Sequence, residues 1–302
     1  MTHTSLTKAI LIALFCLLAS SSIGQRLVGL QTTLQTIADK YPQTTIGFSA
    51  VDLHSGEIFS INGDKRLPMQ SVYKFHLALA VLNQVDQGKL SLDQMILIRK
   101  GDLLPNTHSP LRDKYPNGDV EIPLSDLLSF TVGQSDNNGC DILFRLIGGP
   151  KKVNTYIHKL GMNQVAIVAT EEEMHRDDKI QFTNWTTPNA AIKLLASFYK
   201  KRILSKKTQE FLCKVMTASP SGPNKIKGKL PAGTPVAHKT GYSGANKEGL
   251  TAASNDIGIV TLPNGKHFAV AAFISMTKLE EKSIDSIIAE LTQAVWNEFN
   301  KS

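Results

Sequence analysis

The segment that sets the fold reads SVYKFHLALAVLNQVDQG and runs from Ser71 to Gly88. Its apolar residues recur at three- and four-residue intervals, which predicts a helix over Val72–Gln87 with a buried face. Gly88 stands where that helix would end, a position at which glycine is common. Similar patterns follow along the chain, so its middle part is predicted to be an all-helical lobe.

Helical patterns continue from this segment as far as Met216. They cover Leu124–Val132, Asn137–Ile147, Val153–Leu160, Pro188–Tyr199 and Ser205–Met216. Strand patterns flank them, at Thr45–Leu53 and Glu57–Ile61 before, and at Pro235–Thr240, Asp256–Leu262 and His267–Ser275 after. Further helical patterns, Leu27–Lys40 and Leu279–Phe299, lie outside the strands.

This order predicts an α/β (α+β) protein in which both ends of the chain share one antiparallel sheet flanked by helices. We expect a discontinuous α/β domain from residues 25–66 and 217–302, and an all-helical domain from residues 67–216. A cleft between two such lobes is the usual place for a ligand site.

Residues 1–24 have the composition of a secretory signal peptide. Lys8 precedes the apolar run Ala9–Ala19, and the small residues that follow predict cleavage after Gly24. The run is shorter than the roughly 20 residues that span a bilayer, which argues against a membrane anchor. A lipid anchor on Cys16 is the alternative. We expect a soluble, monomeric chain exported to the periplasm.

The chain carries a formal net charge of +7, with basic runs at residues 200–202 and 206–207. These runs flank an amphipathic pattern and lack interleaved aromatic residues, so they predict a solvated surface and no nucleic-acid partner. The positive charge favours small anionic substrates. The His and Cys residues show no zinc-ligand spacing, and no metal or cofactor is predicted.

Cys140 and Cys213 remain after removal of the leader. Two cysteines in a chain of this length do not make a disulfide framework. Pairing in an oxidising compartment stays open, but we expect two buried thiols, because unpaired cysteine is commonly buried.

Ser71 and Lys74 lie three residues apart at the start of the first helical pattern, which puts both side chains on one face. A serine hydroxyl becomes a good nucleophile when a neighbour accepts its proton, and a lysine near other cations can lose its own charge. The start of a helix also favours developing negative charge. Alone, the pair is weak evidence for catalysis, because chance produces this spacing often.

Two further motifs strengthen the evidence that Ser71 and Lys74 are catalytic. Ser135-Asp136-Asn137 stands between two helical patterns, and Lys239-Thr240-Gly241 lies in a strand pattern. Together with Ser71-Val72-Tyr73-Lys74 they form the signature of class A β-lactamases and penicillin-binding proteins. Over essentially the whole mature chain the sequence resembles the class A β-lactamases. The resemblance implies a β-lactamase/transpeptidase-like fold and hydrolysis of penicillins and cephalosporins. Asp136 and its neighbours would also suit a helix N-cap.

The resemblance implies catalytic roles. Ser71 would attack the lactam carbonyl and form an acyl-enzyme, and Ser135, beside Lys74, would relay a proton to the departing nitrogen. Glu171 would be the general base that hydrolyses the acyl-enzyme, with His175 helping to hold the water. Whether Lys74 or Glu171 is the base for acylation is left open. The alternative for Glu171 is a solvated acidic loop, because three glutamates stand in a row.

The same resemblance implies binding roles. Asn137 would hydrogen-bond the acylamide side chain of the substrate, and Lys239 and Thr240 would bind its carboxylate. The backbone N–H groups of Ser71 and Tyr242 would form an oxyanion hole, in which loss of one donor costs about 3 kcal/mol.

The loop Ala169–His175 departs from the commoner family pattern, which has Arg at Ala169, Pro after the glutamate and Asn at His175. It resembles the extended-spectrum branch typified by PER-type enzymes. Without the proline, a cis bond after Glu171 would cost about 3 kcal/mol. We therefore predict a trans bond, an altered loop path and a wider site that admits bulky cephalosporins.

Three other positions are assigned to the substrate site. Lys225 stands where the resemblance predicts Arg, and it is assigned to the substrate carboxylate, with an exposed surface lysine as the alternative. Tyr242 stands where a small residue is usual, so its ring would narrow the cleft or stack on a substrate. His108 matches a position at the cleft mouth that often carries an aromatic residue, with a surface-loop histidine as the alternative.

Other functions share several of these residues. A penicillin-binding peptidase acting on D-Ala-D-Ala would need no base such as Glu171, and a covalent β-lactam sensor would keep a transmembrane segment. A generic serine esterase is disfavoured, because no Gly-x-Ser-x-Gly motif surrounds Ser71.

Overall fold

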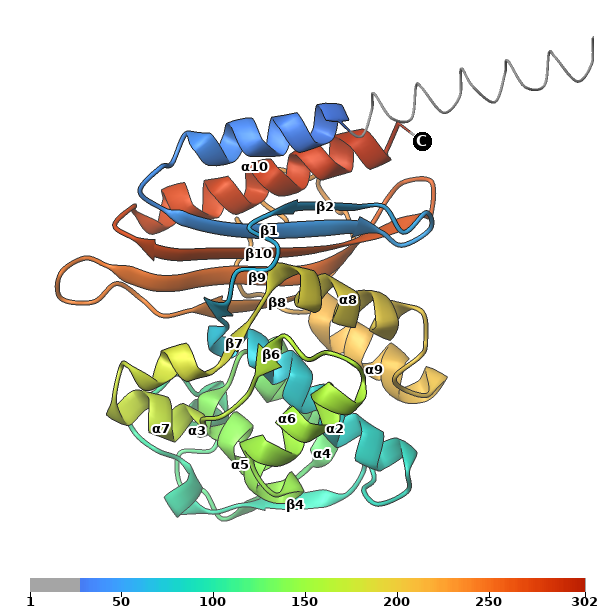
Figure 1. Ribbon diagram of the computed structural model, residues 1–302. Helices are drawn as coiled ribbons and strands as arrows, with labels where there is room; N and C mark the ends of the chain where they lie inside the picture. The colour runs from blue at the N-terminus through green and yellow to red at the C-terminus, as the bar shows by residue number, and fades with distance from the viewer. Residues whose placement is uncertain (1–27, 302) are drawn as a thin grey trace, which may run out of the picture.

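The computed structural model describes residues 28–301 and is built around a five-stranded sheet (Figure 1). The predicted signal peptide, residues 1–24, lies outside the described residues. The strand order is β2-β1-β10-β9-β8, and each of these pairings is antiparallel. The strands are β1 (Thr45–Asp52), β2 (Ile58–Ile61), β8 (Val236–Tyr242), β9 (Thr251–Thr261) and β10 (His267–Thr277).

Helix 28–39 and α10 (Glu281–Phe299) cover the outer face of this sheet (Figure 1). Residues along β10 alternate between the two faces, as the period of a strand requires. Val270 and Ile274 pack into the outer core, whereas Ala271 and Phe273 pack into the core on the other side. Because both faces are buried, β10 is apolar along most of its length.

The inner face of the sheet packs against α8 (Pro188–Tyr199) and α9 (Lys206–Thr217), and the helical lobe lies beyond them. Helix α2 (Tyr73–Asp86) crosses this lobe with every residue from Tyr73 to Leu82 buried. A short 3-10 turn, Gln70–Val72, precedes α2 and contacts β8 and β9. The segment that opens the helical series therefore begins at the junction of sheet and lobe.

The rest of the lobe is a set of short elements around α2. Its helices are α3 (Pro110–Lys114), α4 (Leu124–Leu128), α5 (Asn137–Ile147), α6 (Pro150–Lys159) and α7 (Glu171–Arg176), with 3-10 turns at Lys100–Asp102 and Ile180–Thr183. Its strands are β3 (Leu67–Pro68), β4 (Met95–Ile98), β5 (Val120–Pro123), β6 (Val165–Ala166) and β7 (Trp185–Thr186). The sequence did not predict these strands, because segments so short show no clear alternation.

The predicted helix Leu124–Val132 needs a correction. It is α-helical only to Leu128 and continues as a π-helical turn over Ser129–Gly133. The hydroxyls of Ser129 and Thr131 each donate to the backbone carbonyl four residues earlier, at 2.7 and 2.8 Å. Such bonds compete with the helical N–H groups for the same acceptors and loosen the helix.

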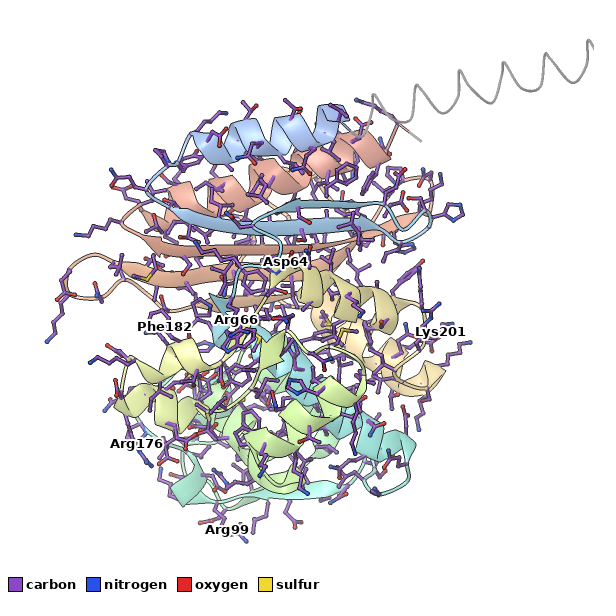
Figure 2. The ribbon with its side chains drawn as sticks, in the orientation of Figure 1. Asp64, Arg66, Arg99, Arg176, Phe182 and Lys201 are labelled. Atoms are coloured by element: carbon purple, nitrogen blue, oxygen red, sulfur yellow. The ribbon has the colours of Figure 1, made fainter. Side chains whose placement is uncertain are left out.

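The loop between β6 and β7, which carries Glu171, is held next to β3, the strand that precedes Ser71. β7 pairs with β3, and the guanidinium of Arg66, which is labelled in Figure 2, lies 4.2 Å from the centre of the Trp185 ring. β7 also pairs with β6, so the chain is fixed on both sides of the loop that carries Glu171. Among residues 28–301, no helix is both long and apolar enough to cross a membrane.

Candidate active site

Ser71 and Lys74 lie next to each other at the start of α2, as their spacing predicts. Lys74 Nζ donates a hydrogen bond to Ser71 Oγ over 3.0 Å. Lys74 is fully buried, whereas Ser71 is half-buried. The candidate nucleophile therefore reaches the surface of a cavity while the amine beside it is held in the interior.

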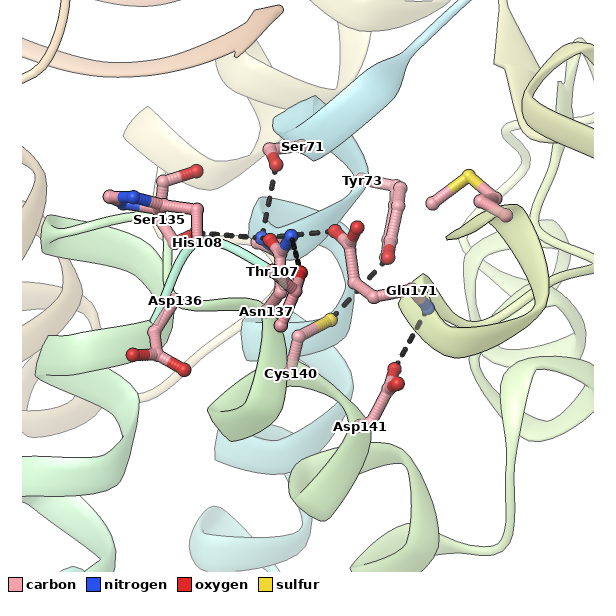
Figure 3. A network of polar contacts seen from close by, with 12 residues as sticks. Ser71, Tyr73, Thr107, His108, Ser135, Asp136, Asn137, Cys140, Asp141 and Glu171 are labelled. Carbon is pink, nitrogen blue, oxygen red and sulfur yellow. Dashed lines mark hydrogen bonds and ion pairs between the residues drawn. The ribbon is translucent and has the colours of Figure 1, made fainter. Parts of the chain in front are cut away.

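The Lys74 ammonium joins residues from three separate parts of the sequence. It donates to the backbone oxygen of Ser135 over 2.8 Å and to Asn137 Oδ1 over 2.5 Å. Its ion pair with Glu171 Oε1 measures 2.9 Å (Figure 3). The Glu171 side chain is 12% exposed, so the alternative of a solvated loop carboxylate is wrong. The structure thus brings all four predicted catalytic residues together.

Ser135 is held in an unusual backbone conformation by its neighbour. Its φ is +59°, in the left-handed region. The buried Asp136 side chain accepts from the N–H groups of Gly139 and Leu111, at 2.7 and 2.6 Å. Asp136 is therefore the N-cap of α5, as the alternative interpretation of this motif predicted. The cap fixes the turn that directs Ser135 towards the cluster.

Lys239 approaches the same cluster from β8. Its ammonium donates to Ser135 Oγ over 2.9 Å and to the Thr240 backbone oxygen over 2.8 Å. Burial, followed by repulsion from Lys74, lowers the pKa of Lys239 to about 7. A group with that pKa can change its protonation state near neutral pH.

Glu171 is positioned through its own backbone. Asp141 on α5 accepts from the N–H groups of Glu171 and Glu172, at 2.9 Å each (Figure 3). Burial raises the pKa of Asp141 to about 6. A capping box between Thr170 and Glu173 starts α7 at the same point. No peptide bond within residues 28–301 is cis, so the bond after Glu171 is trans, as predicted.

Gly241 and Asn255 bring β8 and β9 close to the start of α2. A Cβ on Gly241 would lie 2.5 Å from the Met69 oxygen and 3.1 Å from the Ser71 nitrogen, so only glycine fits. The buried Asn255 amide donates to the oxygens of Pro68 and Met69, at 2.8 and 3.0 Å. This close approach supports the prediction that the N–H groups of Ser71 and Tyr242 contribute to one oxyanion hole.

A cavity of about 480 Å³ opens at this junction. Its walls include the predicted site residues Ser71, His108, Ser135, Asn137, Glu171, His175, Lys225, Thr240 and Tyr242. Lys74 and Lys239 lie behind these walls. Lys74 contacts them through its bonds to Ser71 and Asn137, and Lys239 through its bond to Ser135. His108 lies at the cavity mouth, where its Nε2 is 2.9 Å from the Gln134 oxygen.

The structure contradicts one of the two predictions made for Lys225. Only 3% of the residue is exposed, so the alternative of a surface lysine is wrong. Its Nζ contacts Asp285 Oδ1 at 2.5 Å and Ser254 Oγ at 2.6 Å. It also lies 5.6 Å from the centre of the Tyr242 ring. A substrate carboxylate at Lys225 would have to compete with Asp285.

Several residues that build the site were missed by sequence reasoning. Thr107 accepts from Asn137 Nδ2 over 2.7 Å, and the buried Asn184 binds the backbone of Val168 and Ala169 ahead of Glu171. Asp141 and Asn255 were missed too. One signal was available, since Thr170-x-x-Glu173 is a capping-box pattern that locates the start of α7.

Within the part of the chain that the structure describes, Cys140 and Cys213 are both unpaired. Cys140 is buried, as expected, with its Sγ 3.6 Å from the Tyr73 hydroxyl. Cys213 is only partly buried, which corrects the expectation of two buried thiols. It lies on α9, an amphipathic helix with one side turned towards solvent.

Comparison with known proteins gives a consistent set of relatives. Residues 29–299 match the beta-lactamase enzyme family. Beta-lactamase VEB-1 of Pseudomonas aeruginosa is 42% identical over 260 residues, which are 85% of this chain and 86% of that protein. Extended-spectrum beta-lactamase PER-1 of the same organism is 42% identical over 254 residues, 84% and 82% of the two chains.

Solved structures agree with the sequence relatives. The TLA-1 extended-spectrum beta-lactamase is 47% identical with a TM-score of 0.88, over 90% of this chain and 99% of that one. A class A beta-lactamase from Bacteroides cellulosilyticus is 35% identical with a TM-score of 0.86, over 90% and 99%. The similarity therefore spans the sheet, the helical lobe and the cavity together.

Proposed function

The chain belongs to the beta-lactamase enzyme family, among its class A enzymes, and from this premise we propose that it hydrolyses β-lactams through an acyl-enzyme on Ser71. One observation carries the proposal. Lys74 Nζ contacts both Ser71 Oγ, at 3.0 Å, and Glu171 Oε1, at 2.9 Å. A hydroxyl and a carboxylate joined by one ammonium can serve both the formation and the hydrolysis of an ester.

In the first step, Ser71 Oγ attacks the lactam carbonyl and the carbon–nitrogen bond breaks. Lys74 takes the Ser71 proton once its ammonium has given a proton to the Glu171 carboxylate, and its contacts with both groups allow this relay. Ser135 donates a proton to the departing nitrogen. Its hydroxyl accepts a hydrogen bond from Lys239, which stabilises negative charge on the oxygen as that proton leaves.

In the second step, Glu171 takes a proton from a water that attacks the ester. Its carboxylate lines the cavity and points towards the start of α2. His175 lines the same cavity and is proposed to help hold that water. The backbone N–H groups of Ser71 and Tyr242 would stabilise the oxyanion in both steps.

Substrate binding is assigned to residues on opposite walls. Asn137 is proposed to hydrogen-bond the acylamide group, and Lys239 and Thr240 to hold the carboxylate. Lys225 is proposed to act there only in competition with Asp285. The volume of the cavity, about 480 Å³, and the trans bond after Glu171 favour bulky cephalosporins. Relatives named extended-spectrum enzymes support that preference.

The test uses the Glu171→Gln variant. Parent protein should hydrolyse nitrocefin, and the variant should accumulate a stable covalent adduct on Ser71 after exposure to penicillin, detected by intact-mass spectrometry. A Ser71→Ala variant is the control and should take up no mass. Rapid loss of the adduct from Glu171→Gln would reject Glu171 as the hydrolytic base.

The same experiment separates the rival functions. A covalent sensor or a peptidase would hold the adduct in the parent protein as well, without turnover. Export and a monomeric state are also proposed, on the strength of the leader composition in residues 1–24 and the self-contained cores. Cell fractionation and size-exclusion chromatography with light scattering test them.

A further inference from the structure

One end of the cavity carries an aromatic ring and a carboxylate that the proposed reaction does not use. Tyr242 and Glu281 both line the cavity, and Tyr242 is 40% exposed. Tyr242 ends β8, just after Lys239 and Thr240, and Glu281 begins α10. Two elements far apart in the sequence therefore meet beside the proposed carboxylate site.

The electrostatics of this end are set by three charged groups. Lys225 is neutralised by Asp285, because their side chains form a buried ion pair at 2.5 Å. Glu281 is exposed and contributes a negative charge to the cavity wall. Lys282 is the nearest other cation in sequence and lines a neighbouring surface groove that Glu281 also borders, but the described residues include no ion pair between the two. Beside Tyr242, the charges of Lys225 and Asp285 cancel, and Glu281 adds a negative charge to the cavity wall.

Tyr242 and Glu281 influence each other directly. Burial raises the pKa of the Tyr242 hydroxyl, and the charge of Glu281 raises it further. The faces of a tyrosine ring attract cations, and a carboxylate nearby strengthens that attraction. Lys225 Nζ already lies 5.6 Å from the centre of this ring, but Asp285 neutralises its charge, so the ring beside Glu281 is a suitable place for a permanent organic cation.

The chemistry of cephalosporins brings a substituent to this place. Carbon 3 of the cephem ring is bonded to the carbon that bears the carboxylate, so its substituent lies next to that group. With the carboxylate at Lys239 and Thr240, the substituent extends towards the next residues of β8, which include Tyr242. The acylamide group leaves the opposite side of the bicyclic ring, towards Asn137.

We infer that Tyr242 and Glu281 form a subsite for a cationic substituent at carbon 3, so that the enzyme prefers zwitterionic cephalosporins. This inference rests on the proposed function and adds a substrate class to it. The positions of the two charges on such a substrate match those of the opposite charges along the cavity. Its anionic carboxylate meets Lys239, and its cation meets Glu281.

The test compares cephaloridine and cephalothin, which share a thienylacetyl side chain and differ at carbon 3 by a pyridinium or an acetoxy group. Glu281→Gln should raise the KM for cephaloridine about threefold relative to cephalothin, the size expected for an exposed charge pair. Glu280→Gln is the matched control, because it removes the same charge from the adjacent residue, which does not line the cavity. It should leave the ratio of KM values unchanged.

Salt gives a second measurement that needs no variant. About 0.5 M NaCl should move the KM ratio of the parent enzyme towards the Glu281→Gln value, because salt screens an exposed charge. An equal ratio in parent and Glu281→Gln, or an equal shift in Glu280→Gln, would overturn the subsite. Failure of the parent to hydrolyse either compound would instead overturn the proposed function itself.

Discussion

The Lys239 ammonium lies behind the wall of the cavity, and burial and repulsion from Lys74 lower its pKa to about 7. An amine loses its charge as the pH rises through its pKa. A substrate carboxylate bound to Lys239 would then lose its partner. We predict that kcat/KM for carboxylate-bearing β-lactams falls as the pH rises above about 7.

A Lys239→Arg variant checks the assignment of this pH dependence. The guanidinium stays charged over the accessible range, so the alkaline decline should move to higher pH even where the overall rate is reduced. The methyl ester of the same β-lactam is the control substrate, because it carries no carboxylate. An unchanged alkaline decline in Lys239→Arg would assign the titration to another group.

Individual residues of the site differ in how far the sequence predicts them. Ser71 and Lys74 follow from local spacing on one helix, and Ser135 and Lys239 from short motifs. Asp141 and Asn255 carry no such signal, because their partners lie 30 and 186 or more residues away. Only the folded chain shows that they hold the backbone at Glu171 and Met69.

The loop before α7 depends on one buried amide. Asn184 accepts from the N–H groups of Val168 and Ala169 and donates to the Ala169 oxygen. Asn184→Ala leaves these buried groups without partners, so we predict a loss of about 2 kcal/mol in the free energy of unfolding. Hydrolysis of the acyl-enzyme should slow more than its formation, because Glu171 follows directly on this loop.

Chemical denaturation and rapid-quench kinetics measure the two effects of Asn184→Ala. Asn264→Ala is a suitable control, since its side chain accepts a hydrogen bond in an exposed turn between β9 and β10. It should change neither quantity by much. Equal slowing of both chemical steps in Asn184→Ala would argue against a role in placing Glu171.

For helices with clear capping residues, the sequence predicts the first and last residues as well as the helix itself. Helix α5 begins after the Asp136 cap and ends before Gly148, and α8 begins at Pro188 after a threonine cap. The two-residue strands β3, β6 and β7 show no recognisable pattern in the sequence, because each forms only by pairing with a distant segment. The order of layers was predictable, whereas these small connecting sheets were not.

At the scale of the whole molecule, the Lys225–Asp285 ion pair joins the wall of the cavity to the outer layer through α10. Removal of one partner leaves a buried charge without compensation. We predict that Asp285→Ala lowers the free energy of unfolding by about 3 kcal/mol, measured by urea denaturation.

The double variant Lys225→Met, Asp285→Ala tests the cause of that loss. It removes both charges and should recover most of the stability, because no unpaired ion remains. A double variant as unstable as Asp285→Ala alone would mean that packing, and not charge, accounts for the effect. The pair was not predictable from sequence, since 60 positions separate its members.

The outer layer has a practical consequence. Residues 28–39 and α10 both pack on the outer face of the sheet. Glu281 at the start of α10 lines the cavity, whereas Phe299 at its other end contacts Phe59 of β2. Attachment through either end would therefore leave the substrate entrance unobstructed. A protein arranged in this way is suited to immobilisation on a solid support, or to use as a colour-producing reporter fused to another polypeptide.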